Sequence, residues 1–142
     1  MKYMLLIYID EQALSETKRE ECYAESVQLT HQLKLRGQYL AANPLHPTST
    51  ATSVRVRDGK ALITDGPFAE TREQLGGYFL IDVKDRDEAI GIAARVPGAR
   101  LGTVEIRPVM ELADLPTDEW QRLADAIRGG PTGSRTPDDP GR

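Results

Sequence analysis

The chain begins with an apolar run, residues 3–9, in which both alternating sets of positions are apolar. A strand with one face in water alternates apolar and polar residues, so this run predicts a strand that is covered on both faces. The two sets are Tyr3, Leu5, Ile7 and Ile9 on one face, and Met4, Leu6 and Tyr8 on the other.

A helix is predicted over residues 17–36, because its inward positions fall within an arc of about 80° at 100° per residue. These positions are Cys22, Ser26, Leu29, Leu33 and Gly37. Gly37 is predicted to end the helix, since glycine readily adopts the left-handed conformation found there. A short extended segment, residues 39–42, follows and stops at Asn43 and Pro44.

Two alternating segments, residues 53–57 and 60–64, flank the dipeptide formed by Asp58 and Gly59. An Asp-Gly pair between two such segments is a strong short-range signal of a β-hairpin. We therefore expect a hairpin between the first and second halves of the domain.

The second half of the domain repeats the order strand, helix, strand. A strand is predicted over residues 77–83, and Asp85 followed by Glu88 is typical of a helix start. The inner face of this helix would carry Ala89, Ile92, Ala93 and Val96. A last strand is predicted over residues 101–107.

This order of elements predicts an α+β fold. Without the hairpin it is a ferredoxin-like βαββαβ unit, in which two helices cover one face of a four-stranded antiparallel sheet. The first strand, apolar on both faces, then needs a second cover. We expect that cover to be another copy of the chain, in a homodimer through the open face of the sheet.

Residues 1–112 are predicted to form this domain and residues 113–142 a C-terminal extension. A short helix is expected over residues 117–128, with Trp120, Leu123, Ala124 and Ile127 at helical spacing. The rest, from Gly129 on, is rich in Gly, Pro, Ser and Asp and is expected to be disordered. Truncation after Leu112 should leave the thermal stability almost unchanged.

Composition and charge exclude some classes of binding partner. A net charge of −4 and a pI near 5.2 argue against a general nucleic-acid binder. No stretch reaches the roughly 20 apolar residues of a membrane span, and the single cysteine, Cys22, cannot form an internal disulfide. We expect a cytoplasmic protein. No histidine, cysteine or acidic cluster has metal-ligand spacing, and we expect no metal or other cofactor.

Residues 62–78 resemble the DGPF branch of the YCII-related family. They read Leu62-Ile63-Thr64-Asp65-Gly66-Pro67-Phe68-Ala69-Glu70-Thr71-Arg72-Glu73-Gln74-Leu75-Gly76-Gly77-Tyr78. Segments 49–55, 93–99 and 104–108 support the match, which covers about residues 1–112. The resemblance implies a dimeric α+β barrel. It also implies an association with extracytoplasmic-function sigma factors, and at least one relative acts as a lyase on chlorinated aromatics.

Shorter relatives in this family are thought to use a His–Asp pair. Counted back from Gly37, their histidine corresponds to Ser26, on the inward arc of the first helix. A serine can form hydrogen bonds but cannot serve as a general base near neutral pH. The histidine of the implied pair is therefore absent here.

Asp65 is the first candidate for a catalytic role, because a carboxylate in a turn beside a cleft could act as a general base or bind a polar ligand. A base of this kind should be partly buried. Alternatively, Asp65 accepts the N–H of Phe68 and fixes the turn. Glu70, Arg72 and Glu73, together with Phe68, could bind a small molecule; the alternative is a solvated turn.

His46 is the histidine that we consider for catalysis, because its polar loop could fold near Asp65. His31 lies on the face of the first helix opposite to Cys22 and is expected to be a surface residue. Tyr8 and Tyr78 lie on strands whose second face would meet a partner or line a cleft. Each combines an apolar body with a polar tip, which suits packing or ligand binding.

Three functions remain open from the sequence. The first is a small-ligand-binding or regulatory homodimer, associated with a sigma factor. The second is a lyase or isomerase of small cyclic or aromatic substrates, with Asp65 as base and His46 or Tyr78 as auxiliary. The third is a structural assembly module, which predicts no cavity between the sheet and the DGPF turn.

Overall fold

A computed structural model describes residues 1–114 and 116–129. The helices and strands are β1 (Lys2–Ile9), α1 (Glu16–Leu35), β2 (Tyr39–Pro44), β3 (Thr52–Arg57), β4 (Lys60–Asp65), β5 (Gln74–Asp82), α2 (Arg86–Ala93), α3 (Gly98–Leu101), β6 (Thr103–Pro108) and α4 (Thr117–Arg128). Single 3-10 turns lie at Glu11–Ala13, Thr48–Thr50 and Leu112–Asp114. The chain divides into two units, Met1–Val109 and Met110–Arg142.

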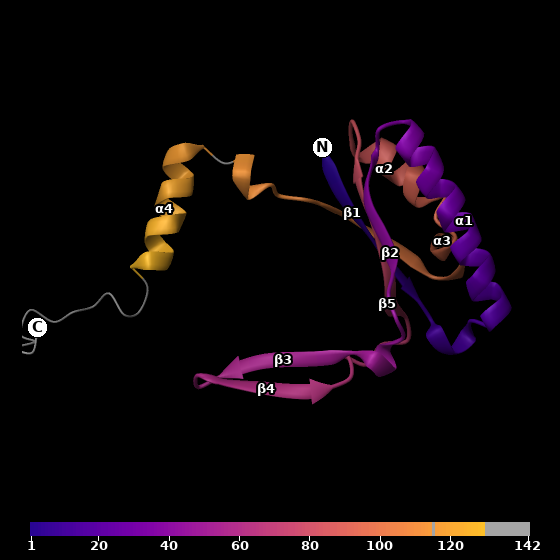
Figure 1. The fold of residues 1–142 in the computed structure, drawn as a ribbon, viewed down its shortest axis with the longest axis horizontal. Coiled ribbons are helices and arrows are strands. Elements are labelled where there is room, and N and C mark those ends of the chain that lie inside the picture. Colours follow the sequence, from indigo (N-terminus) through magenta and orange to yellow (C-terminus); the bar gives the residue numbers. More distant parts are fainter. Residues whose placement is uncertain (115, 130–142) are drawn as a thin grey trace, which may run out of the picture. The chain divides into compact units, whose positions relative to one another are not determined.

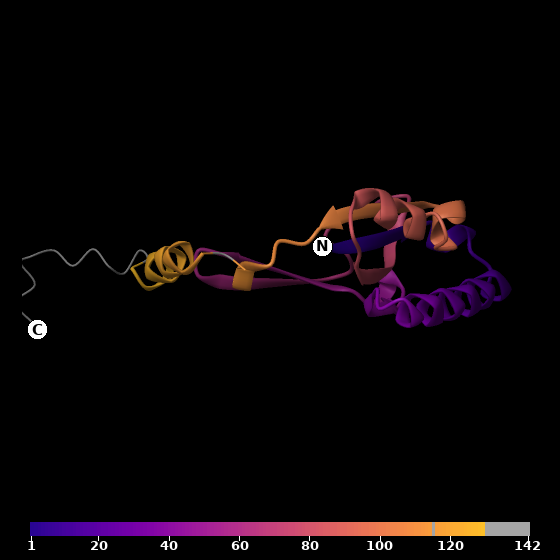
Figure 2. The same cartoon turned by 90° about the horizontal axis from the view of Figure 1, so that it is seen from above.

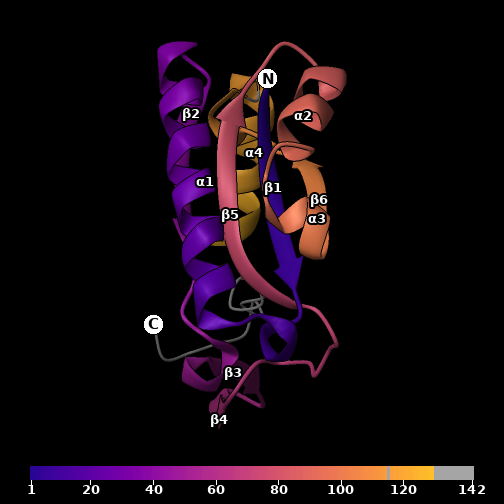
Figure 3. The same ribbon diagram turned by 90° about the vertical axis from the view of Figure 1, so that its right-hand side faces the viewer.

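The first unit has a mixed α+β fold built on a four-stranded antiparallel sheet. The strand order is β2-β5-β1-β6, which is the ferredoxin-like order expected for βαββαβ. Helices α1, α2 and α3 lie on the same face of this sheet (Figure 1). Figure 3 shows α1 beside β2 and β5, and α2 and α3 beside β1 and β6. We call the opposite face of the sheet the open face.

Helix α1 has a defined start and stop. The Ser15 hydroxyl accepts the N–H of Lys18 at 3.2 Å and caps the first turn, so the helix begins at Glu16, one residue before the predicted start. At the other end, Gly37 has φ 68° and donates to the Lys34 carbonyl, while Gln38 donates to the Leu33 carbonyl. This pair of bonds is a Schellman motif, and it confirms the predicted role of Gly37.

Helix α2 begins at the predicted position, but only half of the expected capping box forms. The Asp85 carboxylate accepts the N–H of Glu88 at 3.0 Å. The Glu88 carboxylate does not return to Asp85; it accepts from the Lys84 N–H and the Gln38 side chain. It thereby links the start of α2 to the segment that follows α1.

The hydrophobic core occupies one end of the interface between the helices and the sheet. Leu33 of α1, Leu5 of β1 and Ile81 of β5 are fully buried at its centre. The rest of the core comprises Tyr3, Leu29, Phe79, Val83, Ala89, Ile92, Ala93 and Val96. Ala89, Ile92 and Ala93 confirm the predicted inner face of α2. Val96 is buried as expected, but it lies beyond the helix, which ends at Ala93 and not at Pro97 as predicted.

Strands β3 and β4 pair only with each other, in a separate two-stranded sheet. Their turn, at Asp58 and Gly59, has φ of 52° and 73°, as a type I′ turn requires. The hairpin extends away from the four-stranded sheet (Figures 1 and 2). Val54, Val56 and Ile63 share one face of the hairpin and are exposed.

In the second unit, α4 covers Thr117–Arg128, the range that the sequence predicts. Its apolar positions include Trp120, Leu123 and Ile127, which are exposed. Residues 130–142, predicted to be disordered, lie outside the described residues. Among the helices of residues 1–114 and 116–129, none has the length and hydropathy needed to cross a membrane.

Candidate functional site

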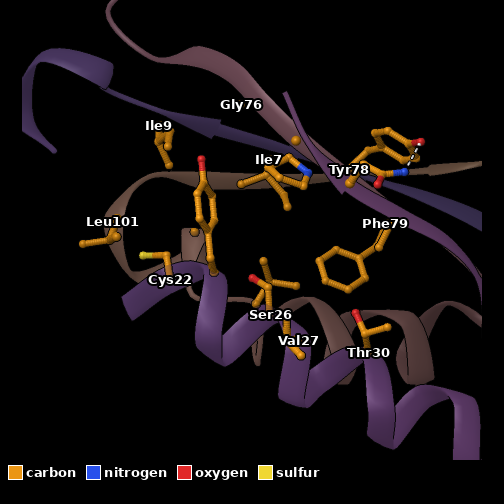
Figure 4. A pocket seen from close by; sticks show the side chains of 17 residues that line it. Ile7, Ile9, Cys22, Ser26, Val27, Thr30, Gly76, Tyr78, Phe79 and Leu101 are labelled. Atoms are coloured by element: carbon orange, nitrogen blue, oxygen red, sulfur yellow. Dashed lines mark hydrogen bonds between the residues drawn. The ribbon is translucent and has the colours of Figure 1, made fainter. Parts of the chain in front are cut away.

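Beyond the core, the interface between α1 and the sheet is hollow. A cavity of about 350 Å³ lies between the middle of α1, residues 22–30, and strands β1, β2 and β5 (Figure 4). Cys22, Ser26 and Thr30, spaced four residues apart on α1, line it. Small side chains at these positions, with glycines across from them, leave space that larger residues would fill. The glycines that line it are Gly76, Gly77 and Gly98.

The walls of this cavity are otherwise mainly apolar. Ile7, Ile9, Val27, Phe79 and Leu101 line it, and Figure 4 shows the Phe79 ring on the α1 side of the strands. The Ser26 and Thr30 side chains are partly buried there. They therefore place two neutral hydrogen-bonding groups in an apolar chamber.

A second cavity, of about 370 Å³, adjoins the first. The residues that line both are Ile9, Cys22, Tyr23, Pro44 and Gly76. Because they share these walls, we treat the two cavities as one α1 cleft with an inner and an outer part. Glu11, Arg19 and His46 line only the outer part, which is therefore the polar end.

The Glu11 carboxylate fixes the loop that carries His46. It accepts the N–H of Thr48 at 2.9 Å and the Thr48 hydroxyl at 2.7 Å. Both oxygens are thus engaged by neutral donors. Arg19 lines the same outer part, is partly buried and, within the described residues, is in no ion pair.

Cys22 does not have the character of a nucleophile. Burial raises the pKa of its thiol, the charge of Glu25 raises it further, and Lys18 and Arg100 oppose the shift. The thiol is therefore protonated near neutral pH, where only a thiolate would be reactive. In the cleft it acts as a small, weakly polar wall.

The open face carries a different hollow, of about 1080 Å³, which we call the DGPF cleft. Pro67 and Phe68 of the DGPF turn line it, opposite Tyr8 and Thr103 of the sheet. The Thr103 hydroxyl donates to the Glu73 carboxylate at 2.9 Å and ties the segment before β5 to β6. The assembly-module hypothesis predicts no cavity between the sheet and the DGPF turn, so the presence of this cleft argues against it.

The two clefts separate the residues singled out in the sequence. Ser26 lines the inner part of the α1 cleft. The residues of the set that line the DGPF cleft are Tyr8, His46, Phe68, Arg72 and Glu73. His46 also lines the outer α1 cleft and so borders both. Tyr78 borders the α1 cleft, but its ring points away from α1 and its hydroxyl accepts from Asn43 at 3.1 Å (Figure 4).

Asp65 and Glu70 line neither cleft. Asp65 is exposed, so the expected partial burial is wrong for this chain. The alternative role in its own turn is also wrong, since Gly66 holds the turn instead. The Gly66 N–H donates to the Ala51 carbonyl at 2.7 Å, and the Ser53 hydroxyl donates to the Gly66 carbonyl at 2.8 Å.

Sequence reasoning missed Glu11, Arg19, Thr30 and Thr48. Thr30 could have been found, because it continues the spacing of Cys22 and Ser26 by one more helical turn. The others meet only when the end of β1, the start of α1 and the loop after β2 come together. Among residues 1–114 and 116–129, no group of three His, Cys, Asp or Glu residues is arranged to hold a metal ion.

Comparison with known proteins identifies the family of this chain. The model of the YCII-related domain matches residues 1–113. An uncharacterized protein of Rhizobium meliloti strain 1021, R00369, is 35% identical over 117 residues, which cover 77% of this chain and 92% of that protein. A similar solved structure is 5-chloro-2-hydroxyhydroquinone dehydrochlorinase from Burkholderia phenoliruptrix AC1100, in complex with 2,5-dihydroxybenzoquinone. It has a TM-score of 0.48 and 11% identity, and the match covers 78% of this chain and 95% of that one.

Proposed function

The chain belongs to the YCII-related domain family, and we propose that it is a small-ligand-binding or regulatory protein whose ligand occupies the α1 cleft. The observation that carries this proposal is the hollow inner part of the cleft, about 350 Å³, beside a core that is fully packed. Mainly apolar walls with a few polar groups are typical of small-molecule sites.

An empty space of this size has a cost in stability. The cleft is open to solvent, so its apolar wall atoms stay in contact with water and give up the stabilisation that burial would bring. A larger side chain at position 26 or 30 would remove this cost without any change in backbone. A binding role explains why the space is left open.

The chemistry of the inner part favours binding over acid–base catalysis. Among the described residues, no histidine or carboxylate lines it, and the Cys22 thiol is protonated near neutral pH. Ser26 occupies the position of the histidine in the implied pair. A ligand held here meets neutral groups that orient it but do not move protons.

The lyase or isomerase alternative would have to use the DGPF cleft, where His46 lies with Tyr8, Arg72 and Glu73. Asp65 lines no part of it, so its assigned base is outside the site. Turnover of a small aromatic or lactone that Asp65→Ala abolishes, with the fold intact by circular dichroism, would favour this alternative over a binding role.

We further propose that the protein acts as a homodimer through the open face. Met4, Leu6 and Tyr8 project from β1 on the side that carries no helix, and are only partly buried in a single chain. A second sheet would cover them. Analytical ultracentrifugation at micromolar concentration tests this: a dimer is expected, and a monomer would contradict the proposal. A sigma factor as physical partner is a prediction that co-purification can test.

A thermal-shift screen against small carboxylates and phenols tests the ligand site. Compounds that stabilise the wild type should stabilise Asp65→Asn equally, because Asp65 lies outside the α1 cleft. They should not stabilise Ser26→Leu, whose side chain fills the inner part. Equal stabilisation of all three proteins would place the ligand elsewhere and contradict the proposal.

A further inference from the structure

We infer that the ligand of the α1 cleft is a small carboxylic acid with an apolar body, whose carboxylate binds Arg19 while its body fills the inner part. This inference rests on the proposed function. It adds the chemical class of the ligand and the side chain that recognises it.

The outer part of the cleft offers a cation that the protein does not neutralise. Arg19 is partly buried and, within the described residues, pairs with no carboxylate. Glu11 is the acidic residue that lines this part, and Thr48 donates hydrogen bonds to both of its oxygens. A guanidinium in this setting can receive a carboxylate through two parallel hydrogen bonds.

The inner part can accept no charged group. Its polar side chains are neutral, with the hydroxyls of Ser26 and Thr30 and the protonated thiol of Cys22. An ion placed there would lose hydration without gaining a counter-charge, which is unfavourable. A charged ligand must therefore keep its charge in the outer part and put its apolar portion inside.

The spacing along α1 suggests the size of the ligand. Seven residues separate Arg19 from Ser26, which corresponds to about 10 Å along the helix axis. A six-membered ring with a carboxylate at one end fits the distance, and a hydroxyl at the other end would reach Ser26.

The experiment compares acids with their neutral amides, which have nearly the same shape. The probes are benzoate, 4-hydroxybenzoate, phenylacetate and hexanoate, each paired with its amide, and the dissociation constant is measured by titration in ligand-observed NMR. Each acid that fits should bind about tenfold tighter than its amide, the effect of one charge-assisted hydrogen bond. The preference should weaken as salt is added.

Two variants with the same change in net charge locate the carboxylate. Arg19→Gln should remove the preference for acids and leave the binding of amides unchanged. Lys18→Gln, at an exposed residue that lines no part of the cleft, should keep the preference. If no acid binds better than its amide to the wild type, or if both variants behave alike, the inference is overturned.

The proposed function can fail separately. Ser26→Leu should abolish the binding of acids and amides together, because it fills the inner part. If probes bind Ser26→Leu as well as the wild type, the ligand does not occupy the cleft and the proposed function fails. If they require an open cleft but do not prefer the acid, only the inference on the carboxylate fails.

Discussion

The two halves of α1 face the same sheet, but one half is tightly packed against it and the other borders a cavity. In the second half, Leu29 and Leu33 pack against β1 and β5 and leave almost no exposed surface. Nearer the N-terminus, Cys22 and Ser26 occupy equivalent positions and border a cavity of about 350 Å³, and we call this stretch, residues 22–26, the hollow half. The helical spacing is the same in both halves, so the difference comes from the small side chains of α1 together with the glycines across from them, Gly76, Gly77 and Gly98.

This difference separates stability from function along one helix. The packed half supplies the buried apolar area that holds the fold. The hollow half contributes less to folding and keeps space for a ligand. Substitutions in the two halves should therefore have different consequences.

The largest effect is expected from Leu33→Ala, in the packed half. Leu33 is fully buried, and truncation of a buried leucine costs about 2–5 kcal/mol. Urea unfolding followed by circular dichroism would measure the loss. Ser26→Ala, at the matching position of the hollow half, should change the free energy of unfolding by less than about 0.5 kcal/mol. Equal losses would show that the two halves are packed alike.

A smaller loss is expected from Gly98→Ala, at the border of the cleft. An added Cβ would lie 2.4 Å from Cγ2 of Ile7, which lines the cleft, so Ile7 must move. We expect a loss of about 1–3 kcal/mol, typical of overpacking, and weaker ligand binding. Gly91→Ala is the control. Its Cβ would meet no atom within 4 Å, and alanine should stabilise α2 by about 0.5–1 kcal/mol.

Filling the cleft should stabilise the fold. Ser26→Leu adds apolar atoms to a mainly apolar cavity, and we expect a gain of about 1 kcal/mol in unfolding free energy. Gln28→Leu places the same side chain on an exposed position of α1 and should give no gain. A loss of stability in Ser26→Leu above about 1 kcal/mol would mean that the cavity cannot accept a leucine.

Local signals made most of the fold predictable from the sequence. Gly37 ends α1, Asp85 starts α2, and Asp58 with Gly59 makes the turn between β3 and β4. Each depends on residues close in the chain, where backbone preference and capping dominate. The capping box at Glu88 was half wrong because Gln38, distant in the sequence, competes for its carboxylate.

The candidate site was less predictable, because its parts come from separate elements. Arg19, His46 and Glu11 carry no shared motif, and only the closed sheet brings them to one outer cleft. The DGPF segment suggests Asp65 as a partly buried catalytic base, yet this residue is exposed. A motif near a turn fixes the local backbone more surely than it identifies a chemical role, and here Gly66 makes the bonds that hold the turn.

The smallest expected effect concerns the reactivity of the Cys22 thiol, in the hollow half of α1. Because burial raises its pKa, the rate of alkylation by iodoacetamide should reach its midpoint at a higher pH than that of a free thiol. The raised pKa also stabilises the fold below the unfolded-state pKa, near 9.0, and this contribution is lost as the pH rises through the folded-state value.

Glu25→Gln removes a charge that raises the pKa of the Cys22 thiol, and it also frees Arg100, whose guanidinium lies 2.7 Å from the Glu25 carboxylate. The alkylation midpoint should therefore fall, and a midpoint that stays or rises would contradict the assigned cause.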